Sequence, residues 1–148
     1  MANFNKIPWI AEHIALYRTD PEKAHMWDST PLGGPGLLPT LLLTTTGRKS
    51  GEPRSLPLIY AESGGSYVIV ASKGGAPSHP AWFKNLETKP ECELMVGPKH
   101  VTARARVAAG EERERLWAKM GKVYPSYDAY QKNAGEREIP VVVLDPVG

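Results

Sequence analysis

A basic loop between two strand-like segments carries the most chemically suggestive residues of this chain. Residues 44–58 read TTTGRKSGEPRSLPL, where Arg48, Lys49 and Arg54 lie close together and only Glu52 opposes them. Arginine offers a planar fork of N–H donors and lysine a compact positive charge. Such a loop fits either a site for a multiply charged anion or a solvated turn that has collected basic residues.

A second candidate segment follows an apolar run and reads ASKGGAP at residues 71–77. Ser72 and Lys73 would emerge at the end of a strand, and the two glycines after them would let backbone amides approach a ligand closely. A helix expected from about His79 would present free N–H groups to an anion or to a polarised carbonyl. The alternative is a flexible loop in front of a packed helix.

A third segment, YPSYDAY at residues 124–130, places Tyr124, Tyr127 and Tyr130 at a spacing of three. Their rings could lie against a flat ligand, and their hydroxyls could donate a hydrogen bond or a proton. Ordinary packing of a last helix against the rest of the protein explains the same pattern.

Several common sites are not supported. The GRKS at residues 47–50 lacks the preceding glycine of a phosphate-binding P-loop, and a strand rather than a helix follows it. There is no G-x-G-x-x-G and no G-x-S-x-G, and four scattered histidines with one cysteine supply no zinc ligand set. Catalysis by protein side chains is therefore poorly supplied, which favours a borrowed cofactor.

Hydrophobic periodicity indicates the elements that would position these residues. Strands are expected over residues 40–46, 54–60, 67–72, 92–96, 100–107 and 139–144, and helices over about residues 5–19, 79–87 and 111–123. Ser78 is expected to cap the second helix, and residues 28–39 to form a Pro/Gly-rich loop. Alternation predicts two inward faces, Cys92, Leu94 and Val96 on one strand and Val101, Ala103, Ala105 and Val107 on another.

Strands joined mostly by short turns predict a mainly β fold. We expect an antiparallel barrel of about six strands with peripheral helices, forming a single domain over residues 1–148.

Composition narrows the setting. A net charge of +2 with scattered basic residues gives no support for nucleic-acid binding. Cys92 cannot form an internal disulfide and has acidic neighbours, which predicts a packing role and a reducing, cytoplasmic setting. The first helix is too polar for a secretion signal or a membrane span. It is expected to pack on the core, although it could also rest at a membrane surface.

Taken together, the segments resemble the deazaflavin-dependent nitroreductase and quinone reductase family of actinobacteria, whose members use coenzyme F420. The matching strings are TTTGRKSGEPRSLPL at 44–58, VASKGGAPSHPAWFKNL at 70–86, ERERLWAKM at 112–120, YPSYDAY at 124–130 and REIPVVVL at 137–144. The resemblance implies a split β-barrel. It also implies a coenzyme whose tail, a phosphodiester followed by glutamates, is the kind of polyanion that the basic residues would hold.

The resemblance carries the following residues over to a coenzyme site: Arg48, Lys49, Ser50, Arg54, Ser55, Leu56, Pro57, Leu58, Ile59, Val70, Ala71, Ser72, Lys73, Ala81, Trp82, Phe83, Lys84, Asn85 and Tyr127. Ile59, Tyr124 and Tyr130 are expected to line a substrate pocket. Ser72 is expected to donate a hydrogen bond to the developing negative charge, with Tyr127 or Tyr130 as proton source.

The activity implied is hydride transfer from reduced F420 to quinones, nitroaromatics or activated enones. Two other functions stay open at this point, an FMN- or haem-binding split barrel and a non-enzymatic carrier of the deazaflavin. The protein is expected to be a monomer or a homodimer, cytoplasmic or peripheral at the inner membrane face.

Overall fold

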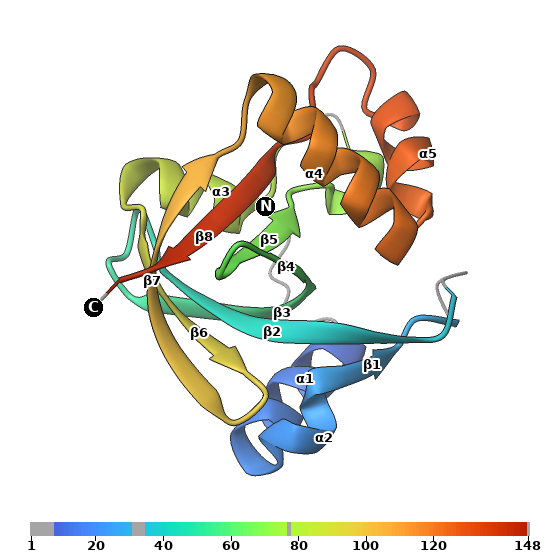
Figure 1. Ribbon diagram of the computed structural model, residues 1–148. Coiled ribbons are helices and arrows are strands. Elements are labelled where there is room, and N and C mark those ends of the chain that lie inside the picture. The colour runs from blue at the N-terminus through green and yellow to red at the C-terminus, as the bar shows by residue number, and fades with distance from the viewer. Residues whose placement is uncertain (1–7, 31–34, 77, 148) are drawn as a thin grey trace.

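The computed structural model describes residues 8–30, 35–76 and 78–147, and it is mainly an antiparallel sheet curled into a half-barrel (Figure 1). Its strands are β1 (Met26–Asp28), β2 (Leu37–Thr46), β3 (Pro53–Ile59), β4 (Ala61–Ser63), β5 (Ser66–Val70), β6 (Glu91–Val96), β7 (Lys99–Val107) and β8 (Val141–Pro146). Its helices are α1 (Pro8–Thr19), α2 (Pro21–His25), α3 (Ala81–Thr88), α4 (Gly110–Val123) and α5 (Ser126–Asn133), with a 3₁₀ turn, η3, over Lys73–Gly75.

The strand order explains how the barrel is built. Strands run β1-β2-β6-β7-β8-β5-β4, and β3 pairs with the other edge of β2. Only Tyr60 separates β3 from β4, so one bent segment pairs with β2 at its start and with β5 at its end. The six strands expected from the sequence correspond to β2, β3, β5, β6, β7 and β8, and the predicted split β-barrel is confirmed.

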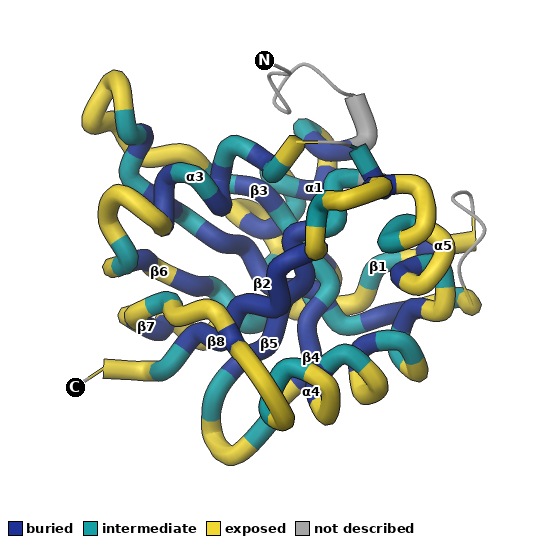
Figure 2. The backbone as a smooth tube through the Cα atoms, turned by 90° about the horizontal axis from the view of Figure 1, so that it is seen from above, coloured by how far each residue is buried: buried dark blue, intermediate teal, exposed yellow. Residues whose placement is uncertain are grey.

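The core follows from residues that alternate along these strands. One buried cluster fills the barrel and includes Leu41, Leu43, Ile69 and Leu94. A second cluster lies where β5 and β8 pack against α4 and α5, with Leu116 and Met120 on the inner face of α4. Figure 2 shows the burial concentrated in the strands, with exposed residues along the outer side of α4 and at the loops.

The N-terminal and the C-terminal helices lie on different sides of the barrel. In Figure 1, α1 and α2 lie together below β2, whereas α4 and α5 lie at the other end, beyond β5. His13 of α1 binds the carbonyl of Ala24 through Nε2 at 2.8 Å, and Tyr17 donates to the carbonyl of Thr40. The first helix thus packs on the core, as the sequence predicts.

Cys92 also behaves as the sequence predicts. Its side chain is buried on the face that it shares with Leu94 and Val96. Burial, and secondarily Glu93 and Glu91, raise the pKa of the Cys92 thiol to about 12, so the thiol stays protonated and serves packing.

Four local predictions are wrong. The strand expected over residues 67–72 ends at Val70, and Val107 is 53% exposed because the chain leaves the sheet there and Ala108 is buried instead. Part of the loop expected over residues 28–39 is strand, since residues 37–39 pair with β1; residues 31–34 lie outside the described residues. Ser78 does not cap α3, whose N-cap is Pro80.

The predicted helix over residues 5–19 is present from Pro8, and its first residues lie outside the described ones. Among the described residues, no helix is both long and apolar enough to cross a bilayer.

Candidate cofactor site

The basic residues of the first motif lie on the connection between β2 and β3, residues 47–52, which we term the tip loop. Two backbone hydrogen bonds close it, from Gly47 N–H to the Glu52 carbonyl and from Gly51 N–H to the Gly47 carbonyl, each 2.8 Å. Gly51 has φ +72°, a conformation that side chains other than glycine's rarely adopt. This tight turn holds Arg48 half-buried and leaves Lys49 exposed.

Asn85 fastens the tip loop to α3. Its side-chain oxygen accepts a hydrogen bond of 3.1 Å from the backbone N–H of Arg48 and a longer one of 3.4 Å from the Arg48 guanidinium. Its amide nitrogen donates to Thr45 Oγ1 at 3.1 Å. Because Asn85 is buried, these bonds fix the position of the basic loop against the helix.

Replacing Asn85 with alanine is expected to lower the free energy of unfolding by about 2–3 kcal/mol, because the half-buried Arg48 N–H and the buried Thr45 hydroxyl lose their partner. Urea unfolding followed by circular dichroism measures this change. Asn133→Ala, on the exposed end of α5, is the matched control and is expected to change stability little. Equal stability of the wild type and the Asn85 variant would show that the tie contributes nothing.

The second motif forms the glycine loop, residues 71–76, between β5 and α3. Lys73 stands in the left-handed region with φ 48°, and its Nζ lies 3.4 Å from Ser78 Oγ. Gly75 packs so closely on α5 that a Cβ there would lie 2.7 Å from the Tyr130 carbonyl oxygen. The loop that carries Ser72 and Lys73 is therefore in contact with the helix that carries Tyr127 and Tyr130.

The three tyrosines of the third motif form one cluster. The ring centroids of Tyr124 and Tyr127 are 5.0 Å apart, and the hydroxyls of Tyr124 and Tyr130 lie 3.1 Å from each other. Burial, followed by the hydrogen bond with Tyr124, raises the pKa of Tyr130 to about 12. Burial first, and then the two neighbouring tyrosines, raise the pKa of Tyr127 as well. Both phenols are therefore protonated donors at neutral pH.

The cations of the candidate site have no carboxylate partner. Arg104, Arg106 and Arg113 each pair with a carboxylate, at 2.8, 2.6 and 3.3 Å respectively. No ion pair is found in the described ranges for the cations of the candidate site, which are Arg48, Lys49, Arg54 and Lys73. Their polar contacts are with neutral groups, such as Arg54 with Ser50 Oγ at 3.5 Å. Their charge remains available to an anion.

Strand β3 follows the tip loop and has β2 as its strand partner along residues 53–59. Pro57 has no backbone N–H to donate, and within sheets proline is typical of edge strands for this reason. The side chains of Ser55, Pro57, Leu58 and Ile59 are half-buried, and Ile59 packs on the same cluster as the tyrosines. Of the expected substrate-pocket residues, Tyr124 and Tyr130 are in contact, and Ile59 packs on the same hydrophobic cluster.

Other expected site residues are placed differently. The side chains of Leu56, Val70, Ala71, Trp82, Phe83 and Tyr127 are buried in the core clusters, whereas Ala81 and Lys84 of α3 are partly accessible. Any contact of the buried residues with a ligand in this conformation would run through their backbone.

Sequence reasoning missed Arg137 as a residue of this region. Its guanidinium donates to the carbonyl oxygens of Ala71, Ser72 and Ala76, at 3.1, 2.7 and 2.8 Å, and lies 3.0 Å from His79 Nδ1. The only signal in the sequence was its place in the REIPVVVL string, which gives no role to the side chain.

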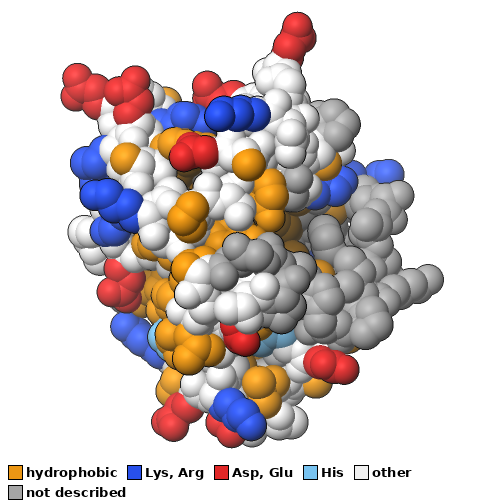
Figure 3. All heavy atoms as spheres, turned by 90° about the vertical axis from the view of Figure 1, so that its right-hand side faces the viewer, with side chains coloured by type: hydrophobic (Ala, Val, Ile, Leu, Met, Phe, Trp, Pro, Cys, Tyr) orange, Lys and Arg blue, Asp and Glu red, His pale blue; other side chains and the backbone are white. Residues whose placement is uncertain are grey.

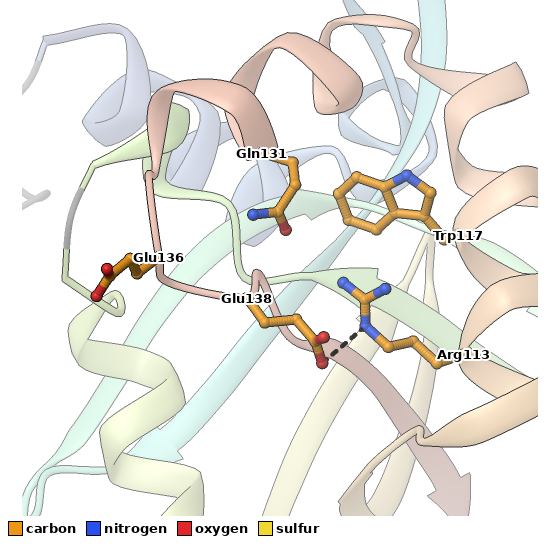
Figure 4. Close-up of a pocket in the computed structure, with 5 residues that line it drawn as sticks. All are labelled: Arg113, Trp117, Gln131, Glu136 and Glu138. Atoms are coloured by element: carbon orange, nitrogen blue, oxygen red, sulfur yellow. Dashed lines mark ion pairs between the residues drawn. The ribbon is translucent and has the colours of Figure 1, made fainter.

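A shallow pocket of about 350 Å³ lies elsewhere, lined by Arg113, Trp117, Gln131, Glu136 and Glu138 (Figure 4). Arg113 donates to the Ile139 carbonyl at 2.8 Å and lies 5.0 Å from the Trp117 ring, and Gln131 binds the backbone of Arg137 and Ile139. Arg113 and Gln131 thus bind the backbone at Arg137 and Ile139, and no residue that lines this pocket belongs to the three motifs, so the pocket lies outside the candidate site.

Comparison with known proteins shows the family to which the chain belongs. A family model described as F420H(2)-dependent quinone reductase matches residues 12–146. An F420H(2)-dependent quinone reductase of Mycobacterium tuberculosis strain H37Rv is 45% identical over 113 residues, which cover 74% of this chain and 75% of that protein.

Two solved structures are similar. An F420-H2 dependent reductase, FDR-A, is 42% identical with a TM-score of 0.66, over 72% of this chain and 93% of the other. A second, described as a domain-swapped dimer, is 35% identical with a TM-score of 0.70, over 94% and 98% of the two chains. The chain therefore belongs to the F420H(2)-dependent quinone reductase family, as an oxidoreductase whose cofactor is coenzyme F420.

Proposed function

We propose that coenzyme F420 binds across α3, with its anionic tail between the tip loop and the glycine loop and its ring system beside α5. The observation that carries this proposal is the set of cations without carboxylate partners on those loops. Cations on two separate loops suit an extended tail bearing several negative charges, including a phosphodiester and glutamates, better than a single small anion.

When bound in its reduced form, the coenzyme supplies a hydride. The protein's part is to hold a quinone against the ring, to exclude water and to meet the negative charge that develops on the acceptor. Ser72, at the start of the glycine loop, is proposed to donate a hydrogen bond to that charge. Tyr130 is the better placed proton source, because its ring is partly accessible, whereas Tyr127 is buried.

Apolar side chains on one face of the molecule support the acceptor assignment. Figure 3 shows such side chains gathered across the face that forms the right-hand side of Figure 1. On the strands of that side, Met26 and Leu37 are 43% and 66% exposed. A quinone is a flat, largely apolar acceptor that such a surface suits, and nitroaromatics and activated enones share these properties. We propose all three classes as acceptors.

The likeness to a domain-swapped dimer supports a homodimer as the working state. We propose the cytoplasm as its location, since the enzyme needs a reduced soluble coenzyme. Size-exclusion chromatography with light scattering tests the dimer directly.

The function is tested by titration and turnover. We expect purified protein to bind F420 in a saturable manner by calorimetry, and to oxidise reduced F420 with menadione under anaerobic conditions faster than the reaction without protein. Binding with turnover at the background rate would make the protein a carrier. Saturable binding of FMN or haem, with none of F420, would make it one of the other split barrels.

A further inference from the structure

Arg137 holds the glycine loop by its backbone. A guanidinium has five N–H donors, and four of those of Arg137 form hydrogen bonds here. Three donate to carbonyl oxygens of the glycine loop and one to the ring nitrogen Nδ1 of His79. Within the described part of the chain, Arg137 has no ion pair with a carboxylate. Its charge is therefore engaged by the loop itself.

We propose that Arg137 is a positioning residue for coenzyme binding: it fixes the backbone of residues 71–76 in the shape that presents Ser72 and Lys73, with neutral His79 as the fourth acceptor. This proposal rests on the proposed coenzyme site. Arg137 does not itself contact the reacting atoms.

The loop conformation shows why such a residue is needed. Lys73 has φ 48° and Gly75 has φ +84°, so two of its residues stand in a region that costs an L side chain free energy. The loop's own backbone bonds are two, from Gly75 N–H to the Ser72 carbonyl and from Ala76 N–H to the Lys73 carbonyl. The bonds from Arg137 join both ends of the loop to one rigid planar group.

Two residues that line the pocket of Figure 4, Gln131 and Arg113, bind the backbone at and close to Arg137. Gln131 of α5 donates to the Arg137 carbonyl at 2.8 Å and accepts from the Ile139 N–H at 2.8 Å. Arg113 of α4 donates to the Ile139 carbonyl at 2.8 Å and pairs with Glu138. Two helices thus hold the backbone at Arg137 and Ile139, and the side chain of Arg137 reaches the glycine loop.

His79 makes the arrangement sensitive to pH. Since Arg137 can only donate, His79 Nδ1 must accept, which requires the neutral ring with its proton on Nε2. Protonation would place two cations 3.0 Å apart. The centroid of the His79 ring lies 4.8 Å from that of Phe83. Burial first, and then Arg137, lower the pKa of His79; Glu87 opposes them and Lys84 adds a smaller lowering. The contact is thus kept at neutral pH and lost as the pH falls below that lowered pKa.

The first test is Arg137→Lys, which keeps the charge but cannot reach four separated acceptors. We expect the F420 dissociation constant to rise about ten- to a hundredfold. Without coenzyme, we expect amide hydrogen exchange of residues 71–76 to accelerate while the strands stay protected. Arg104→Lys, on the exposed face of β7, is the matched control and is expected to change neither quantity.

The second test is His79→Asn, whose side-chain oxygen replaces Nδ1 as acceptor but does not titrate. Between pH 8 and pH 5, F420 affinity of the wild type is expected to fall at the acid end by a larger factor than that of the variant. Titrations of the coenzyme are common to both proteins and cancel in the comparison. The same pH profile in both would remove His79 from the proposal.

The outcomes separate the two proposals. If wild-type protein does not bind F420, the proposed function fails, but hydrogen exchange of residues 71–76 still tests whether Arg137 holds the glycine loop. If the wild type binds F420 but Arg137→Lys shows unchanged affinity and unchanged exchange at residues 71–76, the positioning role of Arg137 is wrong. Should Arg137→Lys not fold, the pH comparison with His79→Asn decides.

Discussion

Replacing Arg48 and Lys73 together with alanine is expected to weaken F420 binding by about a hundredfold or more. A hydrogen bond to a charged group contributes about 1.5–3 kcal/mol net, or roughly tenfold or more in affinity for each cation. The two residues stand on different loops, so their effects should add. Calorimetric titration with F420 measures the change, and the difference between wild type and variant should shrink at high salt, because exposed charges are screened.

The control for this double variant is Lys99→Ala with Arg104→Ala, which removes the same charge from exposed positions on β7. Affinity for F420 should remain at the wild-type value there, since a change in net charge alone does not build a site. If both double variants lose affinity equally, long-range charge rather than the two loops attracts the coenzyme. If neither loses affinity, the tail lies elsewhere.

The longer strands were predictable because the alternation of buried and exposed residues along a strand is a local property of the sequence. Residues that alternate along β6 and β7 have their buried side on one face, and the pattern is visible in the sequence itself. Short pieces escaped prediction for the opposite reason. β1 and β4 are three residues each, too short for alternation to show, and their pairing partners come from β2 and β5.

The candidate site was predictable only in part. Basic residues in a glycine-rich turn and tyrosines at regular spacing can be recognised from residue type alone. The structure places the glycine loop in contact with α5, the helix that carries Tyr127 and Tyr130. Arg137 could not be found in this way, because its acceptors are backbone carbonyls, and no residue pattern marks a carbonyl that will need a donor. Likewise, Asn85 fits a ligand contact or a structural tie equally well until its partners are known.

Gly75→Ala is expected to lower the free energy of unfolding by about 3–4 kcal/mol, the largest stability change foreseen here. The new methyl group would meet the Tyr130 carbonyl oxygen at 2.7 Å and Asn133 Cβ at 3.0 Å, in a backbone conformation with φ +84°. Backbone cannot move aside cheaply, so the glycine loop would have to separate from α5. Urea unfolding measures the loss.

Gly65→Ala separates the two causes. Gly65 has nearly the same φ, +86°, but nothing within 4 Å of a Cβ, so its variant carries the conformational cost without the collision. That cost is about 1–2 kcal/mol. The excess in Gly75→Ala therefore measures the close packing of the glycine loop on the tyrosine helix. If the two variants are equally stable, that contact is loose, and Ser72 and Tyr130 are not held together for reaction; if the excess is present, F420 affinity should fall with it in Gly75→Ala and stay unchanged in Gly65→Ala.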